Sequence, residues 1–250
     1  MAHRMGREPD DRFVAEVMVA ARAVGVTRVI TVGDTMAASR WCVRAANAHP
    51  DVYAAVAVHP NEVNAMSDDD YAELSELARD PRVVAVGETG LDYYWDTVAP
   101  ENQHEHFRRH LALADAVGKP VMIHDREAHA DVLRIVAEQG APRAGVIFHA
   151  FSGDAAMARI CRDAGYVLSF AGVVTFSNAP GLRQALAETG GDGILVETDS
   201  PFLTPHPYRG RPNSPYLVPL TVQAVADVTQ RSPESVISGV RATGNRLFGW

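Results

Sequence analysis

Apolar segments of this sequence repeatedly end in side chains that can bind a divalent metal. Carboxylate oxygen and imidazole nitrogen are ligands for hard and borderline divalent cations, and a bound cation can polarise an ester and ionise water near neutral pH. If the segments are parallel strands, their carboxyl ends meet at one edge, where the active sites of parallel α/β folds lie. The four side chains are Glu88, His124, His149 and Asp199.

Each of these residues, taken alone, also has a structural explanation. A single histidine at a strand end is more often a hydrogen-bonded structural residue than a ligand, because a buried polar group needs a partner. The set favours a metal, since Glu88 and Asp199 would repel each other in a low-dielectric site that held no cation. A fifth apolar run ends in His59, which we expect either to contact a bound phosphate or to cap its strand.

The elements that must position these residues are short apolar runs that alternate with helical stretches. The runs are nearly continuous, as is typical of strands buried on both faces of a parallel sheet. The alternation leaves two architectures, an open doubly wound sheet and a closed (β/α) barrel. A barrel needs eight strands, and seven are recognisable here. These predicted strands are Val26–Gly33, Val52–Pro60, Val83–Gly90, Pro120–His124, Gly145–His149, Tyr166–Gly172 and Gly193–Thr198.

Composition restricts the class of protein. The chain has 250 residues, 47% of them hydrophobic, and no linker divides it, so we expect a single domain over residues 1–250 with residues 1–9 as an irregular remnant. The net charge of −8 argues against a protein that coats nucleic acid. No apolar run is long enough for a membrane span and no signal-peptide core is visible, so the cytoplasm is the expected location. Cys42 and Cys161 are expected to be reduced.

Several separated motifs resemble the signature segments of the TatD family. The resemblance runs in order from about Asp10 to the C-terminus. It implies a TIM-type (β/α) barrel of the metal-dependent hydrolase kind and an activity similar to that of magnesium-dependent deoxyribonucleases, often 3′-5′ exonucleases. The motifs are Val58-His59-Pro60, Gly87-Glu88-Thr89-Gly90-Leu91-Asp92-Tyr93, Ile123-His124-Asp125-Arg126, His149-Ala150-Phe151-Ser152-Gly153, Glu197 to Pro205, and Arg209-Gly210-Arg211-Pro212-Asn213.

The resemblance also implies a role for each ligand. Glu88 would bridge two metals, His124 and His149 would hold the second, and Asp199 would serve the first and act on the attacking water. Glu88 and Asp199 are thus the expected catalytic residues. Mg²⁺ or Mn²⁺ is expected, and Zn²⁺ also suits these ligands.

One part of the family pattern is absent. TatD proteins end their first strand in a His-x-His pair, whereas the only early histidine here, His3, has no such partner. This absence agrees with the count of seven strands. We therefore expect the first strand to be missing, through truncation or a misassigned start, and expect one metal or none in this chain where a complete site holds two.

Other residues are candidates for binding a nucleic-acid substrate, with single-stranded DNA favoured and no obligate protein partner evident. Arg126, Arg209 and Arg211 could hold phosphates, and Tyr93 could stack on a base. Lys119, the only lysine, precedes its strand and lies at the wrong end for a carboxylated-lysine bridge or a Schiff base. Two alternatives stay open: ester hydrolysis of the aminoacyl-tRNA deacylase type, and a metal-binding but inactive protein.

Overall fold

A computed structural model describes residues 10–250 of the chain, so the expectations for residues 1–9 and for a first strand before them lie outside the described residues. The described chain forms two compact units. One comprises residues 30–149 and 247–250, and we call it the β1–β5 unit. The other comprises residues 10–29 and 150–246, and we call it the β6–β7 unit.

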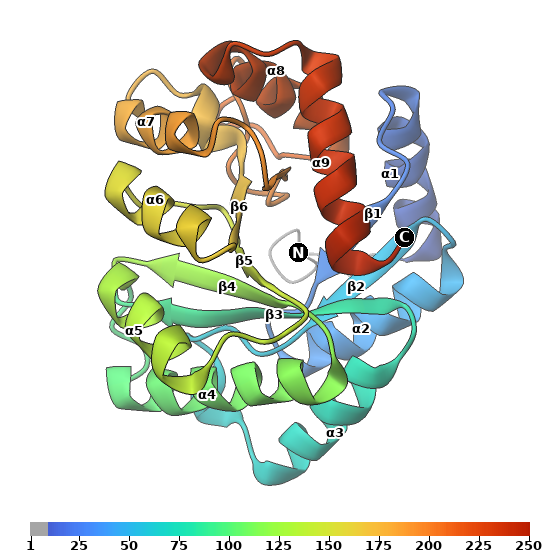
Figure 1. Ribbon diagram of the computed structural model, residues 1–250. Coiled ribbons are helices and arrows are strands. Elements are labelled where there is room, and N and C mark those ends of the chain that lie inside the picture. Colours follow the sequence, from blue (N-terminus) through green and yellow to red (C-terminus); the bar gives the residue numbers. More distant parts are fainter. Residues whose placement is uncertain (1–9) are drawn as a thin grey trace. The chain divides into compact units, whose positions relative to one another are not determined.

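The β1–β5 unit is a sheet of parallel strands in sequence order, covered on one side by helices. The pairs β2–β3, β3–β4 and β4–β5 are all parallel, and Figure 1 shows α2 to α5 along the outer side of the sheet. The elements are β1 (Val29–Val32), α2 (Met36–Ala48), β2 (Val52–Val56), the 3-10 helix η2 (Val63–Ala65), α3 (Asp68–Arg79), β3 (Val83–Asp92), α4 (Pro100–Val117), β4 (Val121–Arg126), α5 (His129–Gln139) and β5 (Val146–Phe148).

Local sequence sets the ends of these helices. Ser67 caps α3 and exchanges hydrogen bonds with Asp70 in a capping box. Pro100 stands in the first turn of α4, and Gly118 ends that helix in the left-handed conformation. The ends of α3 and α4 therefore help to determine where β3 and β4 begin. They thereby affect the positions of the residues at the carboxyl ends of these strands.

Small and branched apolar residues fill the core of this unit. Ala55, Ala85 and Met122 are buried together, and Phe248 from the end of the chain packs against them. A second buried cluster, Val58 with Val63 and Val98, lies beyond β2. The strands that carry Glu88 and His124 are thus supported by apolar packing before they reach the polar edge.

The β6–β7 unit pairs two parallel strands, and α6 packs on β6 and α8 on β7. Its helices α1 and α6 begin at aspartates whose side chains accept a backbone N–H, Asp10 and Asp154. The elements are α1 (Asp11–Ala23), α6 (Ala155–Asp163), β6 (Val167–Phe170), the 3-10 helix η3 (Gly172–Thr175), α7 (Pro180–Thr189), β7 (Ile194–Val196), the 3-10 helix η4 (Pro215–Leu217), α8 (Val218–Thr229) and α9 (Pro233–Phe248).

Each predicted strand corresponds to a strand of the structure, and the predictions err mainly at the ends. Most strands are shorter than their apolar runs, but β3 and β4 continue two residues past their predicted ends, Gly90 and His124. They do so because Leu91 is fully buried and Asp92 pairs with Arg126. Among the described residues, no disulfide joins Cys42 and Cys161, and both side chains are buried. Among residues 10–250, no helix is long and apolar enough to cross a membrane.

A buried histidine in α4 predicts acid sensitivity. His110 is fully buried, with Nδ1 donating to the His106 carbonyl and Nε2 accepting from the Val58 N–H. Burial lowers its pKa from 6.5 to about 4. The unfolded chain therefore takes up a proton that the folded chain excludes, and stability is lost as pH falls from about 6.5 toward 4.

Replacement of this residue tests the effect. We expect His110→Gln, which keeps a donor and an acceptor, to remove about 3 kcal/mol of the decrease in the free energy of unfolding between pH 7 and pH 4. Urea denaturation at a series of pH values measures it, with exposed His206→Gln as the control. Parallel pH profiles for wild type and H110Q would contradict the assignment.

Candidate metal centre

The carboxylate of Glu88 in β3 is the centre of a cluster of three histidines. Its Oε1 atom lies 2.6 Å from His124 Nδ1, 3.7 Å from His149 Nε2 and 3.9 Å from His59 Nε2. His124 lies on β4, His149 directly follows β5, and His59 follows β2. The rings of His59 and His124 meet edge to face, with centroids 4.4 Å apart. Three of the four predicted ligands are therefore brought together, and His59 joins them.

Charge balance explains how these groups coexist. Burial opposes ionisation of Glu88, but the charges of His149 and His124 and a hydrogen bond from His124 outweigh it and lower the pKa of the carboxyl group. Burial also opposes a charge on His124, yet hydrogen bonds to Asp92 and Glu88 raise its pKa to about 9. Burial lowers the pKa of His59 to about 4. The cluster thus holds an ionised Glu88, a protonated His124 and a neutral His59.

The donor set fits a divalent cation. His124 Nδ1 and His149 Nε2 lie 2.6 and 3.7 Å from Glu88 Oε1, so a single ion with ligand bonds of about 2.0–2.2 Å can join the three groups after small side-chain shifts. His59 also has a nitrogen within 4.8 Å of the ligand atoms of Glu88 and His124. Such an ion would take over the positive charge that a proton on His124 otherwise supplies. Because that proton must leave, metal binding here should weaken as pH falls.

Asp92 holds the ring nitrogen of His124 that does not face Glu88. His124 Nε2 donates to Asp92 Oδ2 at 3.1 Å, and the Asn61 amide donates to the same oxygen at 3.1 Å. The Asp92 backbone is in turn held by Gln103, whose side chain accepts from Asp92 N and donates to Asp92 O. Asp92 and Gln103 are each 1% exposed. This is the carboxylate–histidine arrangement that orients metal-binding imidazoles.

Glycine at position 90 permits the close approach of β3 and β4. Gly90 has a φ of +141°, and a Cβ added there would lie 2.0 Å from the His124 carbonyl oxygen. Any side chain at this position would therefore push β4 away from β3. The spacing between Glu88 and His124 depends on this glycine.

The remaining predicted residues of the β1–β5 unit lie around this centre in different settings. The Tyr93 hydroxyl donates to Asp131 at 2.8 Å and lies 2.5 Å from His104 Nε2, so this ring is tied to α4 and α5. The Arg126 guanidinium stacks on Tyr94. The Lys119 ammonium donates to the Ala78 and Asp80 carbonyls at the start of its strand, which agrees with its exclusion from the site.

The fourth predicted ligand, Asp199, belongs to the β6–β7 unit. It follows β7 by three residues and has a φ of 54°, in the left-handed region that aspartate tolerates better than most residues. The buried Asn213 amide donates to the carbonyls of Thr198 and Phe202, on either side of Asp199. Asn213 therefore fixes the turn that presents this carboxylate.

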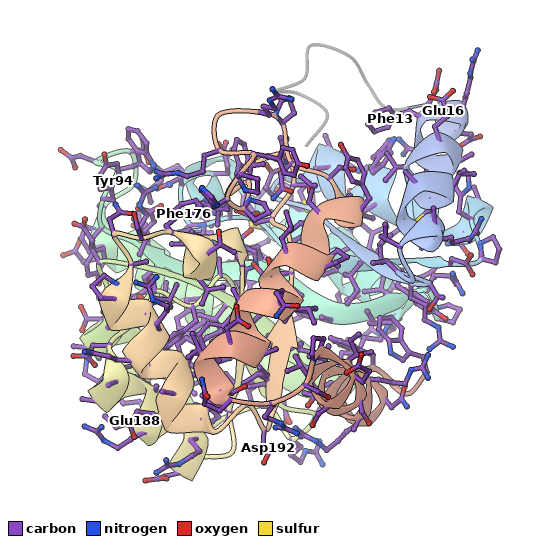
Figure 2. All side chains as sticks on the ribbon, turned by 90° about the horizontal axis from the view of Figure 1, so that it is seen from above. Phe13, Glu16, Tyr94, Phe176, Glu188 and Asp192 are labelled. Carbon is purple, nitrogen blue, oxygen red and sulfur yellow. The ribbon has the colours of Figure 1, made fainter. Side chains whose placement is uncertain are left out.

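The other two predicted arginines line an open cavity of about 710 Å³ in the same unit. Arg209 stacks on the Phe176 ring, with Cζ 4.0 Å from its centroid, and Figure 2 labels Phe176. Arg211 and Phe202 also line the cavity, and no acidic residue among positions 10–250 does. The cavity therefore combines aromatic surface with positive charge.

Comparison with known proteins defines the class. The structure superimposes on the crystal structure of YjjV, a TatD homologue from Escherichia coli K12, with a TM-score of 0.88 and 25% identity over 95% of this chain and 92% of that one. The predicted TIM-type (β/α) barrel fold is thereby confirmed. The protein is a metal-dependent hydrolase of this fold.

The family follows from sequence. Residues 5–249 match the TatD related DNase family, and the chain belongs to it. It is 47% identical over 245 residues to an uncharacterized metal-dependent hydrolase TatD of Mycobacterium tuberculosis, covering 96% of this chain and 92% of that protein. It is 31% identical over 220 residues to a 3′-5′ ssDNA/RNA exonuclease TatD of Edwardsiella piscicida, covering 87% and 85%.

Reasoning from the sequence missed the residues that support the ligands. Asp92 was part of a recognised motif but had no assigned role, although Glu88, Gly90 and Asp92 alternate along one strand and so share a face. If the two-residue alternation of the strand is continued past Gly90, it places Asp92 beside the site. Nothing in the local pattern points to Asn61, Gln103 or Asn213, whose contacts depend on loop conformation.

Neutralising Asp92 is predicted to weaken the metal site. Both Asp92 oxygens accept hydrogen bonds, Oδ2 from His124 and Oδ1 from backbone N–H groups. In Asp92→Asn one of these sites becomes an NH2 donor that faces other donors, and the negative charge that supports His124 is lost. We expect divalent metal affinity to fall by about 10- to 100-fold. Calorimetric titration with Mn²⁺ measures it, with Asp131→Asn as the matched control. An unchanged dissociation constant for D92N would show that Asp92 does not support His124.

Proposed function

We propose that this protein hydrolyses phosphodiester bonds in nucleic acid, as a TatD-type deoxyribonuclease with 3′-5′ exonuclease character. The observation that carries the proposal is the Glu88 carboxylate, which lies among His59, His124 and His149 at strand ends. The family and the relative named as a 3′-5′ ssDNA/RNA exonuclease support nucleic acid, and single-stranded DNA in particular, as the substrate.

We assign the metal ligands as predicted. Glu88, His124 and His149 would hold one divalent ion, with Mg²⁺ or Mn²⁺ favoured and Zn²⁺ also suited to these donors. When bound, the ion supplies a Lewis acid for the phosphate and lowers the pKa of water. Asp199 would serve a further ion in a complete two-metal site. From the ligands described here, one tightly bound ion is expected.

Asp199 and His59 are proposed to activate water and to bind the substrate. Asp199 would orient the attacking water and accept its proton. His59 is neutral at pH 7, and its Nδ1 accepts from the Asn61 N–H at 3.1 Å. Its proton therefore resides on Nε2, which faces Glu88, and this tautomer suits a donor to a substrate phosphate oxygen. We therefore assign His59 to substrate binding. The cytoplasmic location stays a prediction.

Removing the central carboxylate tests the reaction. We expect Glu88→Gln to reduce cleavage of a 3′-labelled single-stranded oligonucleotide in Mg²⁺ or Mn²⁺ by more than about 100-fold, since a ligand should matter more than its supporting residues. Exposed Glu76→Gln is the control, and EDTA should abolish activity. Wild-type protein that cleaves an aminoacyl ester but no phosphodiester would favour the deacylase alternative, and E88Q with full activity would exclude this site.

The arginines of the β6–β7 cavity are proposed to bind phosphates of the substrate. Among residues 10–250, no carboxylate pairs with the guanidinium of Arg209 or Arg211. We expect Arg209→Gln and Arg211→Gln each to reduce the slope of log K against log salt by about 0.7 for single-stranded DNA. Anisotropy titrations measure it, with the ion-paired Arg143→Gln as control. Unchanged slopes would place these arginines outside the binding surface.

A further inference from the structure

Two aromatic side chains are exposed immediately after the buried strand β3. Tyr94 is 49% and Trp95 51% exposed, whereas Leu91 and Asp92 just before them are buried. Their rings meet at 89° with centroids 4.8 Å apart, so the indole stands against the edge or face of the phenol. Figure 2 labels Tyr94 at the periphery of the molecule. Large exposed aromatic surface costs hydration free energy and is therefore a signal of binding.

Arg126 completes this surface. Its Cζ lies 3.7 Å from the Tyr94 ring centroid and 5.8 Å from that of Trp95. Among the described residues, no carboxylate neutralises this guanidinium. We call Tyr94, Trp95 and Arg126 the aromatic platform. It joins stacking surface to an uncompensated positive charge in a chain of net charge −8, and this complementarity selects a ligand with both an aromatic ring and a negative group.

The platform is held rigid by the same carboxylate that supports the metal centre. Asp92 Oδ1 accepts from the Tyr94 N–H at 3.0 Å and from the Trp95 N–H at 3.3 Å. Its other oxygen accepts from His124. The buried Asp92 side chain thus holds the backbone of Tyr94 and Trp95 as well as His124. Because this backbone is already ordered, little conformational entropy is lost when a ring stacks on the platform.

The platform also lies close to the metal centre along both strands. Asp92 is paired with Arg126, and Gly90 with His124, in the ladder between β3 and β4. Arg126 is thus two residues beyond His124 on the same face of β4, a rise of about 6.6 Å. A ligand on the platform would be a neighbour of any group bound at the Glu88 cluster.

We propose that the aromatic platform is a stacking subsite for one unpaired base of a single-stranded polynucleotide, beside the phosphate to be cleaved. The inference rests on the proposed nuclease function and deepens it. Trp95 offers the free stacking surface, and Arg126, fixed on Tyr94, contacts the adjoining phosphate. A base within a duplex has both faces covered by its neighbours, so the subsite selects single strands, with little preference among bases because every base has a π face.

Binding to a lesioned oligonucleotide tests the subsite separately from cleavage. The probes are a labelled eight-nucleotide oligothymidylate and the same oligomer with abasic sites, which keep every phosphate but lack bases, measured by anisotropy in EDTA. We expect wild type to bind the intact oligomer more tightly than the abasic one. Trp95→Leu should reduce the ratio of the two affinities by about 5- to 150-fold. Trp95→Phe should restore part of it. Tyr216→Leu, an exposed aromatic outside the platform, is the matched control.

The outcomes separate this inference from the proposed function. A preference lost in W95L but kept in Y216L supports the subsite, whether or not the wild type cleaves DNA. Equal binding of intact and abasic oligomers by wild type, absence of binding to either, or equal loss for both in W95L would overturn it. Cleavage of single-stranded DNA by wild type and W95L alike would leave the nuclease proposal standing and remove the platform from it.

Discussion

A largely buried, ionised carboxylate, Glu88, is the feature on which the rest of the site depends. Burial alone would favour the neutral acid form of Glu88, and the protein opposes this with three histidines around one carboxylate oxygen. Hydrogen bonds to two carboxylates keep a proton on one of those histidines, His124. A proton and a divalent cation therefore compete for the same role, which is to compensate Glu88. If the proposed cation binds, it replaces the proton on His124 as the charge that compensates Glu88.

That requirement extends into the backbone. The imidazole of His124 can serve Glu88 only if β3 and β4 approach closely, which the absence of a side chain at Gly90 allows. It keeps its orientation only if Asp92 holds its far nitrogen, and Asp92 is itself held by Gln103 from α4. The residues that specify the strand spacing and those that specify the chemistry are therefore neighbours on one strand, at alternate positions of β3.

The sequence sufficed to bring Glu88, His124 and His149 together, because consecutive parallel strands must end at a common edge and the apolar runs marked those ends. It did not place Asp92, since the apolar pattern stops at Gly90 while the hydrogen-bonded ladder continues to Asp92. Nor could it decide the role of His59. That depends on which ring nitrogen accepts the Asn61 N–H, a matter of loop conformation. The roles of Trp95 and Asn213 likewise depend on contacts that the periodicity of the local sequence does not predict.

Arginine stacked on an aromatic ring would allow an acidic chain to bind the polyanionic substrate that we propose. A carboxylate partner would fix a guanidinium but neutralise it, whereas a ring face fixes it and leaves its in-plane N–H donors for phosphate. Such pairs occur in both units, and they include Arg126 on Tyr94 and Arg209 on Phe176. These arginines would supply local attraction in a chain whose net charge of −8 disfavours nucleic acid as a whole. An enzyme built this way would hold a strand locally and release it readily, which suits repeated cleavage better than coating.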